Sequence, residues 1–179
     1  MIDTNDSSTV PTSRAPRRST KPSVATPKRG GLAKGKKRKG VKVDRVFSNA
    51  KTNPYDEKEW DLRTAEITDE GGNVIFKQEN VEVPTDWSQL ATKVVVSKYF
   101  YGEQGTPERE TSVRQLIHRV ARTIADWGVK DGYFTKKDGE IFYDELSWLC
   151  LNQHGAFNSP VWFNVGLHQE YGAGSTSAM

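Results

Sequence analysis

The clearest structural signal in the sequence is the stretch Val113-Arg-Gln-Leu-Ile-His-Arg-Val-Ala-Arg-Thr-Ile-Ala-Asp-Trp-Gly128. Its apolar residues recur at steps of three and four, the period of one helix face: Val113, Leu116, Ile117, Val120, Ala121, Ile124 and Trp127. Polar residues are expected on the opposite face: Arg114, Arg119, Arg122 and Asp126. The pattern predicts an amphipathic helix with one buried face, ending at Gly128.

Two further helices are expected on either side of this one. Residues 87–100 fit a helix that Thr85 or Asp86 can cap and that ends before Gly102. Residues 140–153 fit another helix, which ends before Gly155. The sequence therefore predicts about three helices in all.

A β-hairpin is expected upstream of the helices. The short runs 63–68 and 73–77 flank Asp69-Glu-Gly-Gly72, and a Gly-Gly turn between two such runs is typical of a hairpin. An isolated hairpin is marginally stable, so it must pack on the helices. The expected fold class is α+β and mainly helical.

The last apolar segment of the sequence has a different pattern. Residues 161–165 (Val-Trp-Phe-Asn-Val) favour a short buried strand, entered through Asn158-Ser159-Pro160. No later run offers a strand to pair with it, because the chain continues into a Gly- and Ser-rich tail. The sequence therefore predicts an incomplete fold.

Charge is distributed unevenly along the chain. Residues 1–43 hold twelve Lys and Arg and two Asp, a net charge of +10, whereas fourteen basic and 21 acidic residues give residues 44–179 a net charge of −7. Residues 1–40 contain no aromatic residue, so they are predicted to be a disordered basic arm. The clusters 14–18 and 34–39 can bind nucleic acid weakly through its phosphates, or the arm can be a solvated extension. The second interpretation is favoured, since no aromatic is available to stack on bases.

Several classes of protein are disfavoured. No apolar run approaches the ~20 residues of a membrane span, and no secretion signal is recognisable at the N-terminus. A single cysteine, Cys150, cannot form an internal disulfide, which favours a reducing, cytoplasmic compartment. The expected organisation is an arm at 1–40, a helical region with a hairpin at 41–155, and a terminal segment at 156–179.

No self-contained active site or metal site is recognisable. The histidines show no zinc-ligand spacing, and Cys150 lies on the apolar side of its expected helix, where a buried thiol is the usual interpretation. Asn158-Ser159-Pro160 is the one candidate binding segment. Its hydroxyl and amide groups suit an anion such as a diphosphate, and the alternative is an ordinary turn into a strand.

Four blocks of the sequence together resemble one family. They are Gly40-Val-Lys-Val-Asp-Arg-Val-Phe-Ser48 with Asn53-Pro-Tyr-Asp56, Ala91-Thr-Lys-Val-Val-Val-Ser-Lys-Tyr-Phe-Tyr-Gly102, Pro107-Glu-Arg-Glu-Thr-Ser-Val-Arg-Gln-Leu-Ile117 and Asn152-Gln-His-Gly-Ala-Phe-Asn-Ser-Pro-Val-Trp-Phe-Asn-Val-Gly-Leu167. In order and approximate spacing they resemble the start of the adenosylcobalamin-dependent (class II) ribonucleotide reductases. The resemblance runs from about residue 40 to 172, and FNSPVWFNVGL (157–167) is its most specific part.

This resemblance implies a large enzyme that converts ribonucleotides into deoxyribonucleotides. The family has a ten-stranded α/β barrel, a radical from adenosylcobalamin, redox cysteines inside the barrel and a thioredoxin-like reductant. The resemblance also implies that 161–165 is the first barrel strand, and that Ser159 and Asn158 bind the substrate there, Ser159 through its phosphates.

The family's catalytic cysteines do not match any position in the chain. The expected protein is therefore an N-terminal fragment or split subunit of a vitamin B12-dependent ribonucleoside-diphosphate reductase. It is expected to be inactive without the remaining barrel, to contain no catalytic residue and to bind no cobalamin alone. The alternative is a non-enzymatic module whose basic arm binds nucleic acid.

Overall fold

The structure is a computed structural model that describes residues 40–173. The basic arm expected at 1–40 lies outside the described residues, except for Gly40. The elements in chain order are η1 (Pro54–Glu57), β1 (Trp60–Thr68), β2 (Val74–Pro84), α1 (Gln89–Tyr99), α2 (Val113–Lys130), α3 (Lys136–Leu151), α4 (Ser159–Asn164) and α5 (Leu167–Tyr171). This α+β, mainly helical content confirms the expected fold class. Between residues 40 and 173, no helix is long and apolar enough to cross a membrane.

The predicted β-hairpin is present and longer than expected. Strands β1 and β2 pair antiparallel, and Asp69 closes the turn by accepting a hydrogen bond from the backbone N–H of Asn73 at 2.8 Å. Strand β2 continues beyond residue 77, past an irregularity near Asn80, which has a φ of 56°. That extension supplies Val81 and Val83, which are fully buried. Helix α1 packs against both strands.

Helix α1 forms where it was expected but begins at a different cap. The N-cap is Ser88, whose Oγ accepts a hydrogen bond from the N–H of Ala91 at 3.0 Å, so the predicted caps Thr85 and Asp86 are wrong. Both of those residues precede the helix in a turn, in which the N–H of Trp87 bonds to the Pro84 carbonyl.

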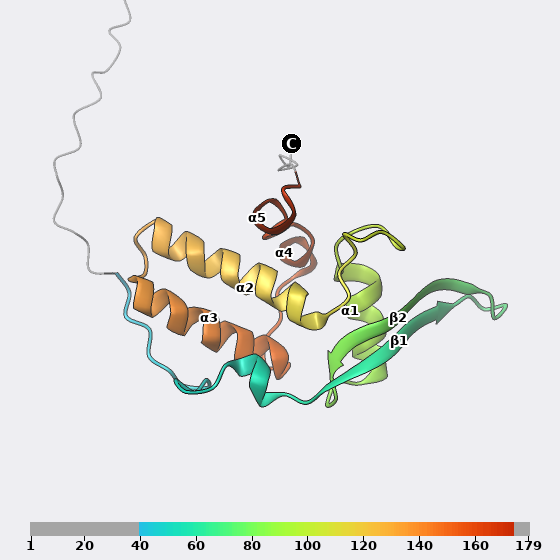
Figure 1. The fold of residues 1–179 in the computed structure, drawn as a ribbon, viewed down its shortest axis with the longest axis horizontal. Helices are drawn as coiled ribbons and strands as arrows, with labels where there is room; N and C mark the ends of the chain where they lie inside the picture. Colours follow the sequence, from blue (N-terminus) through green and yellow to red (C-terminus); the bar gives the residue numbers. More distant parts are fainter. Residues whose placement is uncertain (1–39, 174–179) are drawn as a thin grey trace, which may run out of the picture. The chain divides into compact units, whose positions relative to one another are not determined.

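Helices α2 and α3 lie side by side (Figure 1). Helix α2 starts with a capping box between Ser112 and Gln115, and it continues two residues past the predicted end at Gly128. Helix α3 starts four residues before the predicted Glu140, because Thr135 caps it by accepting from the N–H of Asp138.

The irregular segment before η1 is held by one carboxylate. Glu145 of α3 accepts hydrogen bonds from the backbone N–H groups of Val46, Phe47 and Ser48, and from the Ser48 hydroxyl. Arg45 adds an ion pair with Asp144, at 2.6 Å. These contacts fix a chain segment that has no regular secondary structure of its own.

The strand expected at residues 161–165 is absent, and most of this stretch lies in the short helix α4. A five-residue apolar run does not distinguish a strand from a buried helix by its pattern. Pro160 lies in the first turn, where its missing N–H costs nothing and its fixed φ suits a helix. In the described chain the one sheet is the β1–β2 hairpin, so a strand here would leave its backbone groups unpaired.

Candidate functional site

Asn158 and Ser159 lie together where the chain enters α4. Asn158 is the N-cap residue, with extended backbone angles (φ −69°, ψ 161°), and its side chain makes no capping hydrogen bond. It is exposed, whereas Ser159 is half-buried. The structure thus leaves the Asn158 amide free of the helix and places the Ser159 hydroxyl beside it in the chain.

The Ser159 hydroxyl contacts the last residue of α1. Its Oγ lies 3.2 Å from the phenolic oxygen of Tyr99. The Tyr99 ring packs against two aromatic rings of α4, with centroid distances of 6.4 Å to Trp162 and 5.3 Å to Phe163. Helix α1 therefore supports the candidate site through one polar and two aromatic contacts.

A buried arginine holds the other end of α4. Arg119 of α2 donates from Nη1 to the carbonyl oxygens of Val165 at 2.7 Å and Trp162 at 3.2 Å. It also pairs with Glu110, with 2.8 Å between Nε and Oε1. Sequence periodicity placed Arg119 on the exposed polar face, and that prediction is wrong because its side chain is only 1% exposed.

Glu110 connects this cluster to two more parts of the chain. Its Oε2 accepts from the backbone N–H of Tyr101 at 2.8 Å, and its Oε1 accepts from the Tyr171 hydroxyl at 3.0 Å. The rings of Tyr101 and Tyr171 stack at 4.7 Å. Burial, together with the negative charge of Glu110, raises the pKa of Tyr171, so its hydroxyl stays protonated and can donate.

The end of α1 is fixed by a second arginine. Arg109 donates to the carbonyl oxygens of Val96, Phe100 and Gly102, at 2.7, 2.7 and 3.0 Å. Carbonyls in the last turn of a helix lack partners within the helix, so these bonds cap α1 immediately beside Tyr99.

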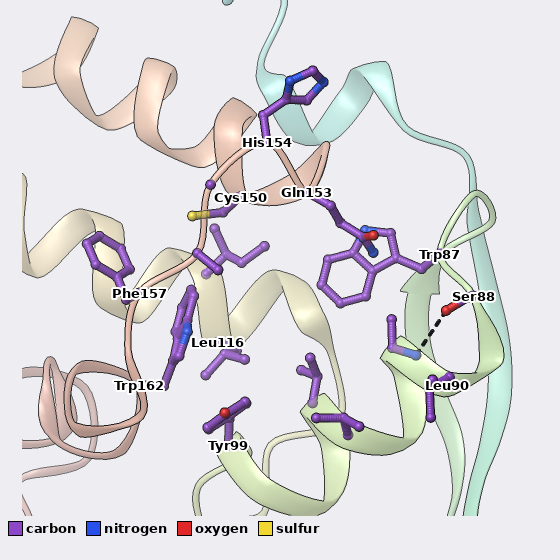
Figure 2. Close-up of a pocket in the computed structure, with 16 residues that line it drawn as sticks. Trp87, Ser88, Leu90, Tyr99, Leu116, Cys150, Gln153, His154, Phe157 and Trp162 are labelled. Carbon is purple, nitrogen blue, oxygen red and sulfur yellow. Dashed lines mark hydrogen bonds between the residues drawn. The ribbon is translucent and has the colours of Figure 1, made fainter.

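A pocket of about 570 Å³ adjoins the site, between α1 and the segment that leads to α4 (Figure 2). Its walls are mainly apolar and aromatic, and they include Trp87, Leu90, Tyr99, Phe157 and Trp162. Ser88, Gln153 and His154 also contribute polar side chains to its lining.

Cys150 also lines this pocket but does not have the properties of a reactive thiol. It is 7% exposed, and burial raises its pKa to about 12. The thiolate, which is the nucleophilic form, is therefore scarce at neutral pH. The sequence-based interpretation of Cys150 as a buried apolar residue is confirmed.

The described residues contain no group of three or more His, Cys, Asp or Glu side chains that could hold a metal ion. His118 fits a structural role, because its Nδ1 lies 2.7 Å from the Tyr143 hydroxyl on the neighbouring helix. Residues 40–173 provide a Ser159 hydroxyl held by Tyr99 and an exposed Asn158 amide, which suit binding more than bond-breaking chemistry.

The sequence pointed to Asn158 and Ser159 as candidate binding residues, which stays a prediction, but it did not single out Tyr99, Arg119 or Glu110 as their supports. The block Ser97-Lys-Tyr-Phe-Tyr-Gly102 offered a signal, since three aromatics at the end of a helix exceed what one buried face requires. Arg119 had a weaker signal in the sequence, because it lies three positions after Leu116 on the helix and next to Val120, both of them apolar.

Comparison with known proteins assigns the chain to a family. Residues 61–153, just over half of the chain, match the family model described as class II vitamin B12-dependent ribonucleotide reductase. The chain belongs to this family, as the sequence resemblance predicted. The matched range ends before Asn158, so it does not include the candidate site.

Individual relatives agree with this assignment. The chain is 62% identical over 138 residues to the vitamin B12-dependent ribonucleotide reductase of Rhodopirellula baltica, covering 75% of this chain and 13% of the relative. The reductase of Streptomyces avermitilis is 47% identical over 145 residues, which cover 80% of this chain and 15% of the relative. The reductase of Bradyrhizobium diazoefficiens is 36% identical over 166 residues, which cover 74% of this chain and 13% of the relative. The chain thus spans about one seventh of the length of these relatives or less. The alternative of a non-enzymatic binding module gains no support from these matches.

Proposed function

We propose that this chain supplies the N-terminal part of a vitamin B12-dependent ribonucleoside-diphosphate reductase, which converts ribonucleotides into deoxyribonucleotides. The observation that carries the proposal is the 62% identity to the Rhodopirellula baltica reductase. In this proposal residues 41–155 form the helical region and residues 156–179 lead into the catalytic barrel.

Ser159 and Asn158 are proposed to contact the phosphates of the substrate. A phosphate oxygen accepts hydrogen bonds, the Ser159 hydroxyl can donate one, and the Asn158 amide can donate two. The exposed Asn158 side chain is not engaged in helix capping. Tyr99 and Arg119 hold the entry and the end of α4, so the Ser159 hydroxyl is positioned before substrate arrives, and the Asn158 amide lies next to it in the chain.

The chain is proposed to be inactive by itself. The reaction replaces the ribose 2′-hydroxyl by hydrogen, releases water and oxidises a dithiol to a disulfide. The sequence contains one cysteine, and it is buried, so a dithiol must come from the remaining barrel and be restored by a thioredoxin-like reductant.

Adenosylcobalamin would supply the radical in the complete enzyme. The described residues do not fit this cofactor, because a corrin carries many amide groups that require hydrogen-bond partners, whereas the pocket walls are mainly apolar. The cobalamin site is therefore assigned to the rest of the enzyme. Weak contact of residues 1–40 with nucleic acid remains a prediction.

The proposal is tested in a complete reductase that contains this chain, made by exchanging it for the matching segment of the Rhodopirellula baltica enzyme. We expect activity with adenosylcobalamin and a dithiol, and none from the 179-residue chain alone. Ser159→Ala should raise KM about ten- to a hundredfold, since it removes a hydrogen bond to a charged ligand. Ser97→Ala is the matched control, because within residues 40–173 the Ser97 hydroxyl bonds only to a carbonyl of its own helix. Activity of the lone chain would contradict the proposal, and an unchanged KM in Ser159→Ala would remove Ser159 from the site.

A further inference from the structure

Tyr99 and Ser159 are 60 positions apart in sequence, yet their hydroxyl oxygens lie 3.2 Å apart. Tyr99 is the last residue of α1 and Ser159 the first of α4. The contact is the one side-chain hydrogen bond of Ser159 in the described structure. The Ser159 hydroxyl, which is proposed to bind substrate, is therefore in direct contact with the phenol of Tyr99 from another helix.

The two helices that meet here are both fixed by arginines. Arg109 holds the end of α1 through the carbonyls of Val96, Phe100 and Gly102. Arg119 holds the end of α4 through two carbonyls, and its side chain is 1% exposed. Tyr99 thus lies at the fixed end of α1, and Ser159 begins a six-residue helix whose other end is fixed, so both hydroxyl groups are carried by anchored elements.

The Tyr99 ring has little freedom of its own. It is half-buried and packs at 6.4 Å from the Trp162 ring and 5.3 Å from the Phe163 ring. Aromatic rings at these separations attract each other in tilted geometry. The phenolic hydroxyl is consequently aimed at Ser159.

Hydrogen-bond chemistry decides which hydroxyl donates when a phosphate is bound. A serine hydroxyl has one hydrogen and two acceptor sites, and a phosphate oxygen only accepts. Ser159 must therefore give its hydrogen to the phosphate, which leaves its oxygen to accept from Tyr99. A chain of hydrogen bonds that ends on an anion is polarised in one direction, and each bond strengthens the next.

We propose that Tyr99 is a positioning residue for substrate binding: it donates to Ser159 Oγ and thereby directs the Ser159 hydroxyl hydrogen toward a phosphate oxygen of the ribonucleotide. This inference rests on the proposed substrate role of Ser159. Tyr99 itself does not touch the substrate, and its contribution disappears when Ser159 is absent.

The test is a double-mutant cycle in the complete reductase, with the variants Tyr99→Phe, Ser159→Ala and both together. Tyr99→Phe keeps the ring and removes only the hydroxyl, so we expect KM to rise about two- to tenfold, with kcat nearly unchanged. The double variant should have the same KM as Ser159→Ala, because Tyr99 acts only through Ser159. Tyr133→Phe is the matched control, since Tyr133 is 64% exposed in the α2–α3 connection.

The outcomes separate this inference from the proposed function. If Ser159→Ala leaves KM unchanged, the substrate role of Ser159 is wrong. If Ser159→Ala raises KM and Tyr99→Phe does not, the role of Ser159 stands and the Tyr99 inference fails. Additive effects in the double variant also overturn the inference, because Tyr99 would then act independently of Ser159.

A second measurement uses the 179-residue chain alone and does not require activity. The three-bond couplings between the α and β protons of Ser159 report its χ1 rotamer. We expect one rotamer in the parent chain and averaging among rotamers in Tyr99→Phe, with the Tyr133→Phe control unchanged. Rotamer averaging in the parent chain would overturn the inference, because Ser159 would then not be positioned by Tyr99.

Discussion

Arg119 and Glu110 form an ion pair whose side chains are 1% and 0% exposed, with 2.8 Å between Nε and Oε1. Burial of two charges costs several kcal/mol for each ion unless further hydrogen bonds satisfy them. Further hydrogen bonds do satisfy this pair. Arg119 also donates to the carbonyls of Trp162 and Val165, and Glu110 accepts from the N–H of Tyr101. The pair links the end of α1, helix α2 and the candidate site.

Replacement of Arg119 should therefore destabilise the protein strongly. Arg119→Met leaves the Glu110 carboxylate buried without its counter-charge and leaves two carbonyls without donors. We expect a loss of about 3–5 kcal/mol in the free energy of unfolding, measured by urea denaturation of the whole chain. The double variant Arg119→Met/Glu110→Leu should recover part of this loss, since it removes both charges.

Lys77→Met is the control for this prediction. Lys77 pairs with Glu79 at 2.6 Å, a shorter distance than in the buried pair, but the two side chains are 46% and 59% exposed. Solvent screens such a pair, so its loss should not measurably change the free energy of unfolding. If Lys77→Met and Arg119→Met lowered the free energy of unfolding equally, burial would not determine how strongly these ion pairs stabilise the protein.

A substitution at Gly166 should disturb the same cluster by sterics. Gly166 has a φ of +85°, and a Cβ there would lie 2.4 Å from Arg119 Cγ and 2.6 Å from the Arg119 carbonyl oxygen. Gly166→Ala should lower the free energy of unfolding by clearly more than the ~1–2 kcal/mol that a left-handed backbone alone costs a residue with a Cβ. Gly172→Ala isolates that backbone cost, because Gly172 also has a positive φ, +62°, but no atom of residues 40–173 lies within 4 Å of its added Cβ. Thermal unfolding of both variants makes the comparison, and equal shifts in Tm would contradict the close approach.

Local pattern was enough to predict the hairpin and the three longer helices. The turn at Asp69-Glu-Gly-Gly72 and the periodicity of Val113 to Trp127 depend on neighbours in sequence, and the structure has both the hairpin and the helix. The prediction that Trp127 lies on the buried face is wrong, because Trp127 is 42% exposed. Helix boundaries were less accurate, because capping by Ser88 and Thr135 depends on which of several polar residues adopts an extended backbone.

The candidate site could be predicted only in part, since its supports come from distant segments. Ser159 was predicted as a site residue through a resemblance, but its contact with Tyr99 depends on the packing of two helices. Arg119 was assigned to the polar face of the helix by periodicity, and arginine is rarely buried. Its carbonyl partners lie 43 and 46 positions downstream, and helical periodicity contains no information about them.

Cys150 should react slowly with thiol reagents in the folded chain. Burial raises its pKa to about 12, which leaves little thiolate at pH 8, and the side chain is only 7% exposed. We expect alkylation by iodoacetamide to be at least about a hundredfold slower than in the same chain unfolded in urea. Mass spectrometry of timed samples measures both rates. Similar rates in the two states would show that the thiol is accessible and not suppressed by burial.

Glu145 should make the stability of the segment before η1 depend on pH. Burial alone would raise the pKa of Glu145, but hydrogen bonds from the Ser48 side chain and from the backbone N–H groups of Phe47, Ser48 and Val46 lower it below its usual value. Because the folded pKa is depressed, the stabilisation is complete above the pKa of the unfolded chain, about 4.3. It is lost as pH falls through the folded pKa.

Glu145→Gln tests this pH dependence, because the amide is isosteric but uncharged. At pH 7 the substitution should cost roughly 1.5–3 kcal/mol, since it replaces charge-assisted hydrogen bonds with neutral ones and brings an amide donor close to backbone N–H donors. The difference between the parent chain and Glu145→Gln should shrink as pH falls below about 4. Urea denaturation from pH 3 to 7 measures this difference in the free energy of unfolding. The control is Glu70→Gln, since Glu70 is an exposed residue of the hairpin turn. A difference that stays constant over this range would mean that ionisation of Glu145 does not stabilise the folded chain.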